Sequence, residues 1–350
     1  MSAYFRVLQP GISTTIQDRG RFGAQALGVP VSGAMDPEML RLANALVGNS
    51  PWEAALEIVH AGPVLEVEAQ TVRIALAALG GVLTVNGPET RTIPPWRGVT
   101  LKKGDRLRIA ATGMAVCAYL AVEGGFDVPP VMGSLSTYVR GRIGGLNGRA
   151  LIAGDRLAIK RERASERPDM VFPKPPTFES GPLRVVPGPQ SDRFQPEAFD
   201  ILCGSVYVVG RAADRMGLRL EGPEIPHRDG HDIVSDGIAT GAIQVPGDRR
   251  PVLLLPDRQT VGGYPKIGTV CSADLPRAGR LRTGDKVRFA PISAAAAQAL
   301  VRRRHVEIEA LAASLTPAGD GGLDLNALYL SNLVSGVVSG DEPDDVGASG

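Results

Sequence analysis

The hydrophobic positions of this 350-residue chain fall mostly into short runs and alternations, not into long amphipathic stretches. Such runs, bounded by Gly, Pro, Asp or Asn, are typical of β-strands. Six of them are clear, at residues 5–8, 64–67, 73–77, 116–122, 206–209 and 252–255. We therefore expect a mainly β protein with a few helices.

Three segments show helical signals instead. The clearest begins at Asp36, whose side chain can cap a helix, with Pro37 at the first helical position. Apolar residues then follow at helical spacing as far as Gly48, which ends the helix. Two further helices are predicted, over residues 196–202 and over the Ala-rich stretch 293–315.

A Gly-Asp turn that leads into a short strand occurs three times, at residues 104–105, 154–155 and 284–285. In each copy apolar residues stand two and four positions after the Asp, and so lie on one face of the strand. The irregular spacing of the copies excludes a solenoid or a propeller. The pattern favours two related β lobes, both barrel-like, although chance recurrence of a common turn would also explain it.

The best domain boundary lies at residues 161–182, where a run of charged residues precedes a Pro-rich stretch. This composition favours an exposed connector. We therefore divide the chain into an N-terminal β lobe (1–160), a linker (161–182), a C-terminal β lobe with a helix (183–315) and a C-terminal segment (316–350). The acidic, Gly-rich end of that last segment is expected to be disordered.

Composition excludes several classes of function. The 38 Lys and Arg residues against 37 Asp and Glu leave a net charge of +1. The chain therefore lacks the excess of positive charge that is typical of proteins that bind nucleic acid or an anionic membrane. No apolar stretch is long enough to cross a bilayer, and the N-terminus lacks the pattern of a signal peptide. The three cysteines are odd in number and far apart, which favours buried reduced thiols. We expect a cytoplasmic protein.

Several common site motifs are missing. The sequence contains neither a P-loop nor the Gly-x-Ser-x-Gly elbow of serine hydrolases. The Gly-rich segment 141–149, with Arg140 before it, is suited to wrap a ligand with backbone N–H groups or to form a twisted loop. His227 and His231 lie close to aspartates, but Gly230 between them disfavours a helix that would align them, so no metal site is expected.

Candidate chemistry lies in three polar segments held between glycines and prolines, at residues 14–23, 214–237 and 244–266. Short strands there deliver charged or amide side chains at their ends, where a pocket mouth would lie. Arg binds a carboxylate or phosphate through two hydrogen bonds, and Gln or Asp fixes an amide or ureido group. Lys266 and Asp257 are candidate acids or bases. The alternative for each segment is a turn whose Asp and Arg satisfy local backbone groups.

These segments resemble a known family. The chain is similar to the family of biotin-dependent carboxyltransferases and 5-oxoprolinase C subunits, also called allophanate hydrolase subunit 2 or KipA-like. The resemblance covers residues 10–49, 121–138, 141–155, 185–192, 214–225 and 235–270, and the last block, SDGIATGAIQVPGDRRPVLLLPDRQTVGGYPKIGTV, is highly specific. It implies a β-barrel architecture related to cyclophilin-like folds, without peptidyl-prolyl isomerase function.

The resemblance implies a subunit of ATP-dependent 5-oxoprolinase, which converts 5-oxoproline to glutamate. Its implied partners are an allophanate hydrolase subunit 1-like (KipI-like) protein and a lactam-opening subunit. One alternative is a carboxyltransferase subunit that moves a carboxyl group from carboxybiotin to urea or a related amide. Another is a non-catalytic regulator that antagonises a kinase inhibitor. ATP would act in the complex, and biotin would sit on a partner carrier. Because this chain has neither an ATP motif nor a biotin-attachment tripeptide, ATP or biotin would bind either to a partner or to this chain in an unconventional way.

The resemblance also places the site residues. We expect Lys266 and Asp257 to be catalytic, Gln244 and Gln259 to contact the amide, and Arg258 to hold a carboxylate or carboxyphosphate-like anion together with Arg215. The remaining expected substrate-binding residues are Gln17, Asp18, Arg21, Glu221, Ser235, Asp236 and Tyr264. The chain departs from the family at Ala213, where a Ser is frequent, and at His231.

Overall fold

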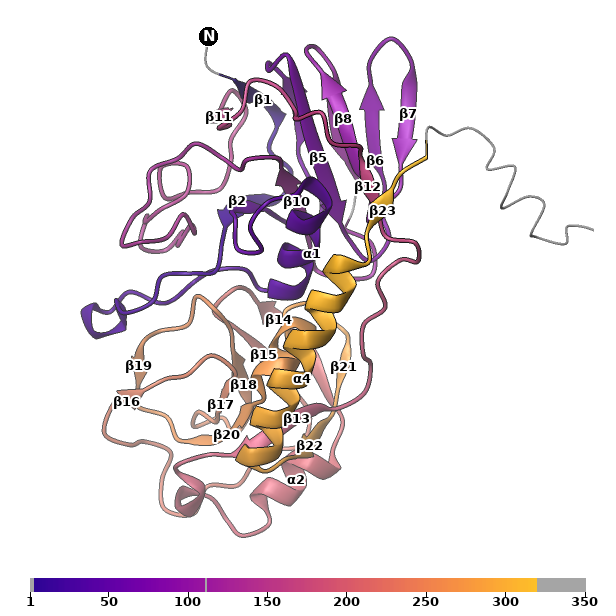
Figure 1. The fold of residues 1–350 in the computed structure, drawn as a ribbon. Coiled ribbons are helices and arrows are strands. Elements are labelled where there is room, and N and C mark those ends of the chain that lie inside the picture. Colours follow the sequence, from indigo (N-terminus) through magenta and orange to yellow (C-terminus); the bar gives the residue numbers. More distant parts are fainter. Residues whose placement is uncertain (1–2, 111, 320–350) are drawn as a thin grey trace, which may run out of the picture. The chain divides into compact units, whose positions relative to one another are not determined.

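The computed structural model describes residues 3–110 and 112–319, and residues up to Pro317 belong to one unit. Strands outnumber helices in this unit (Figure 1), which confirms the expectation of a mainly β protein. We use N-terminal lobe for residues 3–160 and C-terminal lobe for residues 183–315. The division at the 161–182 linker stays a prediction, and the predicted disordered end, from Gly340 onward, lies outside the described residues.

The N-terminal lobe consists of two antiparallel sheets that pack face to face, because apolar residues from both form one buried cluster. The first sheet has the order β11 (Arg156–Ala158), β1 (Tyr4–Gln9), β4 (Val64–Val67), β9 (Arg106–Ile109), β6 (Leu83–Asn86) and β7 (Thr90–Ile93). The second has the order β2 (Ser13–Gln17), β3 (Ala55–Val59), β10 (Cys117–Val122), β5 (Thr71–Ala77) and β8 (Gly98–Lys102).

The C-terminal lobe is built on one eight-stranded sheet that curls into a nearly closed barrel. Its order is β21 (Lys286–Val287), β14 (Tyr207–Ala213), β15 (Gly217–Glu221), β18 (Val252–Leu254), β17 (Ala242–Gln244), β20 (Lys266–Val270), β13 (Leu183–Pro187) and β22 (Phe289–Pro291). Two small ribbons complete the strands, β16 (Asp236–Gly237) with β19 (Val261–Gly262), and β12 (Met170–Val171) with β23 (Thr316–Pro317).

The predicted helices are present within two residues of their expected ends: α1 (Pro37–Val47), α2 (Ala198–Gly204) and α4 (Ala294–Ala313). The short α3 (Leu275–Ala278) and the 3-10 turns Gln25–Leu27, Ser191–Arg193 and Ser272–Asp274 were not predicted. Helix α1 begins as expected, since the Asp36 carboxylate accepts hydrogen bonds from two N–H groups of the first turn at 3.0 Å. Figure 1 shows α4 beside α1, against which it packs.

The three Gly-Asp turns share one structure. In each, the Asp carboxylate accepts a hydrogen bond from the N–H three residues earlier, at 2.8–2.9 Å. The glycine stands at a φ of 88–91°, a left-handed conformation that residues with a Cβ rarely adopt. Two copies lie in the N-terminal lobe and one in the C-terminal lobe, so both lobes use the same turn to start a strand.

Candidate active site

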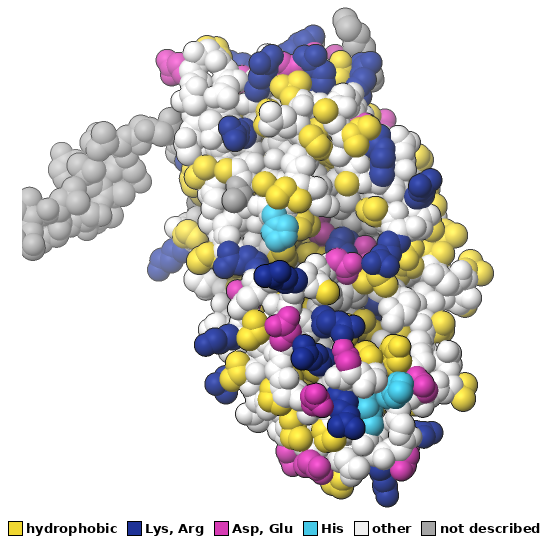
Figure 2. Space-filling model, turned by 180° about the vertical axis from the view of Figure 1, so that it is seen from behind, with side chains coloured by type: hydrophobic (Ala, Val, Ile, Leu, Met, Phe, Trp, Pro, Cys, Tyr) yellow, Lys and Arg dark blue, Asp and Glu magenta, His cyan; other side chains and the backbone are white. Residues whose placement is uncertain are grey.

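An open cleft of about 490 Å³ runs along the C-terminal lobe, beside the turn between β14 and β15. Three sequence-predicted residues line it: Gln244, Gln259 and Tyr264. Its other lining side chains include three arginines, Arg140, Arg211 and Arg219. Figure 2 shows basic and acidic side chains interspersed over one face of the molecule, with no broad region of one charge. Asp214 also lines the cleft, so its charged lining consists of three arginines and one aspartate.

Two glutamine amides form the centre of the site. Gln259 Nε2 donates to Gln244 Oε1 at 3.1 Å, and Gln244 Nε2 donates to the backbone carbonyl of Tyr264 at 3.2 Å. This chain of bonds fixes the orientation of both amides and leaves the Gln259 oxygen to accept from a ligand amide. A Cβ at Gly262 would lie 2.9 Å from Gln244 Nε2, so a side chain there would displace this amide.

A buried lysine lies next to the amide pair. Gln244 and Lys266 are register partners on β17 and β20. The Lys266 side chain is only 4% exposed, and its Nζ donates to Asp236 Oδ2 at 2.9 Å. This hydrogen bond lowers the pKa of the Asp236 carboxyl below its ordinary value. Gln190 donates to the same oxygen at 3.1 Å and accepts from the Lys266 N–H.

Arg258 is a buried cation without a counter-ion in the described part of the chain. It is 3% exposed, and Nε donates to the Ile238 carbonyl at 3.0 Å. Its Nη1 is buried and has no partner there. Burial lowers the pKa of the guanidinium to about 10, so it is still charged at neutral pH. Because a buried unpaired charge is unfavourable, this group is suited to an anion that a ligand brings in.

Arg215 and Asp257 are already bound to each other. Two N–H groups of Arg215 donate to the Asp257 carboxylate at 2.8 and 3.0 Å, another pairs with Glu57, and Nη2 also donates to the Gly33 carbonyl. Burial alone lowers the pKa of Arg215, but the carboxylates of Asp257 and Glu57 raise it above its ordinary value. This geometry favours a structural role for both residues, and their predicted roles in anion binding and proton transfer stay predictions.

Three other predicted residues lie away from the cleft and hold the segment 131–137. The Asp18 carboxylate accepts from the Ser134 hydroxyl at 2.7 Å. Arg21 Nη2 and Gln17 Nε2 donate to backbone carbonyls of the same segment at 2.6 and 3.0 Å. Burial lowers the pKa of Arg21. Their predicted contact with substrate is untested, and the contacts they make are structural.

Two further predicted residues are exposed and, like Asp236, Lys266 and Arg258, are not among the residues that line the cleft. Glu221 is at the end of β15, and Ser235 directly precedes Asp236. Two residues at the site, Gln190 and Arg140, were not among the site residues expected from the sequence. Gln190 lies in residues 185–192, a block of the family resemblance, and that block could have pointed to it. Arg140, directly before the Gly-rich segment, reaches the cleft and pairs there with Asp214 at 3.3 Å.

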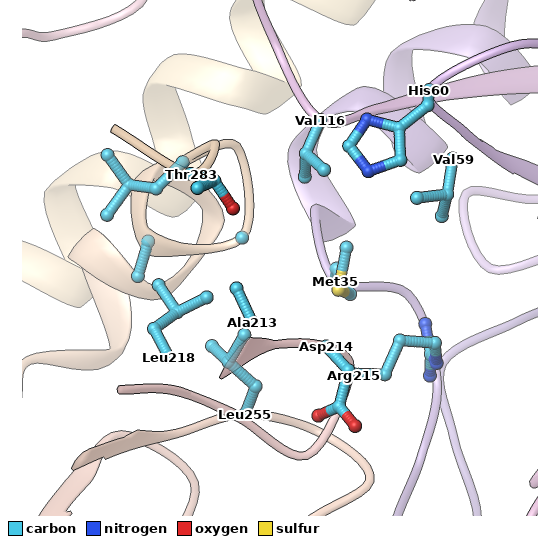
Figure 3. Close-up of a pocket in the computed structure, with 13 residues that line it drawn as sticks. Met35, Val59, His60, Val116, Ala213, Asp214, Arg215, Leu218, Leu255 and Thr283 are labelled. Atoms are coloured by element: carbon cyan, nitrogen blue, oxygen red, sulfur yellow. The ribbon is translucent and has the colours of Figure 1, made fainter. Parts of the chain in front are cut away.

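A second, narrower pocket lies behind the same turn, where side chains of both lobes face one another (Figure 3). Met35, His60 and Val116 line it from the N-terminal lobe, and Leu218 and Leu255 from the C-terminal lobe. Its volume of about 60 Å³ has room for only a few water molecules. The open cleft is therefore the better candidate for substrate.

Within the described residues, no group of three or more His, Cys, Asp and Glu side chains is arranged to bind a metal ion. His227 and His231 lie 6.3 Å apart between ring centroids. The same part of the chain has no helix that is long and apolar enough to cross a membrane. Cys117 and Cys271 are buried, and Cys203 is half-buried.

Comparison with known proteins gives consistent matches. Residues 27–291 match the family model described as carboxyltransferase domain, subdomain A and B. The chain is 35% identical to the C subunit of 5-oxoprolinase from Escherichia coli (strain K12), covering 82% of this chain and 91% of that protein. It is 30% identical to the protein of the same name from Haemophilus influenzae, covering 84% and 93%.

A solved structure of Kluyveromyces lactis urea amidolyase superimposes with a TM-score of 0.80 at 31% identity. The match covers 89% of this chain and 20% of the urea amidolyase. The chain therefore spans about a fifth of that structure, but nine tenths of the bacterial relatives.

Proposed function

Because this chain belongs to the carboxyltransferase-domain family, subdomains A and B, we propose that it is the C subunit of an ATP-dependent 5-oxoprolinase. The observation that carries the proposal is the pair of bonded amides, Gln244 and Gln259, that lines the cleft, with Lys266 as the register partner of Gln244 on the neighbouring strand. Arg258 follows Asp257 in the same segment as Gln259 and is buried, and its part in the site is a proposal. The match to bacterial relatives of that name, over 91% and 93% of their length, supports it.

The chemistry of the cluster fits the substrate. 5-Oxoproline presents a planar N–C=O group and a carboxylate. The glutamine pair is suited to bind the amide by donor and acceptor contacts, and Arg258 supplies a cation for the carboxylate. Lys266, held by Asp236, lies on the strand beside Gln244, and in this proposal it transfers a proton at the bound amide group.

The proposal assigns ATP and the lactam-opening step to the complex. The implied partners are a subunit-1-like protein and a lactam-opening subunit. ATP binding is assigned to them because the chain has no P-loop.

A carboxyltransferase acting on urea or a related amide is the second candidate, favoured by the superposition on urea amidolyase. Carboxybiotin would supply an activated carboxyl group, and its ureido ring and carboxylate suit the glutamine pair and the cleft arginines. The two candidate functions differ in the substrate: urea has no carboxylate, whereas 5-oxoproline has one. A purely regulatory protein would tolerate changes in the cleft, since only its partner surface would matter.

The test is release of ADP and glutamate from 5-oxoproline by this chain, co-expressed with its subunit-1-like and lactam-opening partners. We expect activity that needs all three proteins and is lost in Lys266→Ala. The control is Lys103→Ala, which should keep the activity, because Lys103 is exposed and does not line the cleft. No activity from a well-assembled complex would overturn the proposal, and carboxyl transfer from carboxybiotin to urea would then be assayed.

A further inference from the structure

Glu57 is a carboxylate in the interior of the N-terminal lobe. It lies in the middle of β3 and is fully buried. Its Oε2 accepts from the Tyr119 hydroxyl at 2.5 Å and from the Met35 N–H at 2.8 Å, and Oε1 pairs with Arg215. A buried carboxylate is tolerated only with such a complete set of donors. Here one of those donors comes from the other lobe.

Arg215 connects Glu57 to the active-site region. It stands on the turn between β14 and β15 and holds Asp257 with two side-chain bonds at 2.8 and 3.0 Å. The Asp257 N–H donates to the Arg215 carbonyl at 2.9 Å, so backbone and side chain are both fixed. Glu57, Arg215 and Asp257 therefore form one continuous set of charge-assisted bonds between the lobes.

Asp257 belongs to the segment 256–265, called the site loop here, which carries Arg258 and Gln259 and leads into Lys266 on β20. The N-terminal lobe reaches this loop a second time, because the Ser32 N–H donates to the Pro256 carbonyl at 3.1 Å. Catalytic groups must be held within about 0.5 Å of their working geometry. The first residues of the site loop thus depend on the N-terminal lobe for their position.

We propose that Glu57 is a positioning residue for the reaction, and that Tyr119 supports it. Buried ion pairs add little net stability compared with apolar packing of similar volume, so stability alone is a weak reason for this pair. Its effect on the site is direct: Glu57 orients Arg215, Arg215 fixes Asp257, and Asp257 sets the start of the loop that presents Arg258 and Gln259. The catalytic part of this inference rests on the proposed function, whereas the effect on the loop does not.

The experiment compares Glu57→Gln with Glu123→Gln, a matched control. Glu123 is also buried and pairs with an arginine, Arg73, at 2.6 Å, and neither residue lines the cleft. Hydrogen exchange of residues 256–266 is measured on this chain, and kcat and KM on the assembled complex. For Glu57→Gln we expect at least tenfold faster exchange in 256–266 and at least a tenfold lower kcat, with KM changed less than threefold. Glu123→Gln should lower Tm without either change.

The exchange rates and the kinetics together test the role of Glu57. Wild-type exchange and wild-type kcat in Glu57→Gln would overturn the inference. Faster exchange in 256–266 together with an inactive wild-type complex would support the link between the lobes and reject the proposed function. If Glu57→Gln does not fold, Tyr119→Phe removes one of the three bonds to Glu57, and we then expect a smaller change of the same sign in both measurements; no change would overturn the inference.

Discussion

The ammonium group of Lys266 is buried, and its carboxylate partner Asp236, 2.9 Å away, is exposed. The partner is thus accessible from solvent while the lysine is held in the interior. Since Lys266 keeps the pKa of Asp236 below its ordinary value, the carboxylate stays charged down to pH values under 3.8. The Asp236 carboxylate is therefore charged throughout the neutral range.

The first prediction concerns this pair. Asp236→Asn removes the charge that holds the Lys266 ammonium, and we expect kcat to fall about tenfold, less than in Lys266→Met. Because the pKa of Asp236 is lowered, its titration should cause no change in the wild-type rate between pH 5 and 8. Steady-state rates over that range check both points. A pH-dependent change of the rate in this range that is present in the wild type and absent from Asp236→Asn would contradict the lowered pKa of Asp236.

The second prediction concerns the amide pair. Replacing Gln259 by Ala removes one ligand contact and leaves the Gln244 oxygen without its donor, so we expect KM to rise about tenfold, the effect of about 1.4 kcal/mol. Gln195→Ala is the control, since that amide donates to a backbone carbonyl outside the cleft. Substrate titrations of the assembled complex give the comparison. An equal rise of KM in both variants would show that the effect is not specific to the cleft.

Local signals made most of the fold predictable. The Asp36 cap, Pro37 and Gly48 lie close together along the chain, and the helix they indicate is present. The Gly-Asp turns were recognisable for the same reason, because each Asp bonds only three residues back. The alternation of apolar residues placed the strands but could not give their order in the sheets.

The candidate site was only partly predictable, since polar density does not reveal which partner a side chain meets. Asp18 and Arg21 stand in a polar segment like those of the cleft, but their partners are more than 100 residues away, in the segment 131–137. Arg215 and Glu57 are 158 positions apart. Such pairings depend on how two lobes pack, which spacing along one chain does not encode.

The third prediction concerns acid stability. Burial acts to raise the pKa of Asp274, but hydrogen bonds from Arg184 outweigh it and hold the pKa below the ordinary 3.8. A lowered pKa means that the bonds stabilise the fold fully above that value and are lost as pH falls through the folded-state pKa. Asp274→Asn should therefore lower the free energy of unfolding by about 2 kcal/mol at pH 7, and by much less at pH 2. Denaturant unfolding across this range measures it, and a constant difference at all pH values would contradict it.

The last prediction separates stability from activity at Arg258. Its guanidinium is buried with one hydrogen bond, to the Ile238 carbonyl, and has no carboxylate partner in the described residues. Arg258→Met removes the unpaired charge and keeps much of the volume, so we expect the free energy of unfolding to rise by about 1 kcal/mol. The same change should abolish turnover of 5-oxoproline, because the cation for its carboxylate is lost. Thermal unfolding and the coupled ADP and glutamate assay are measured on one preparation. A variant that is less stable and still active would show that Arg258 serves the fold and not an anionic substrate.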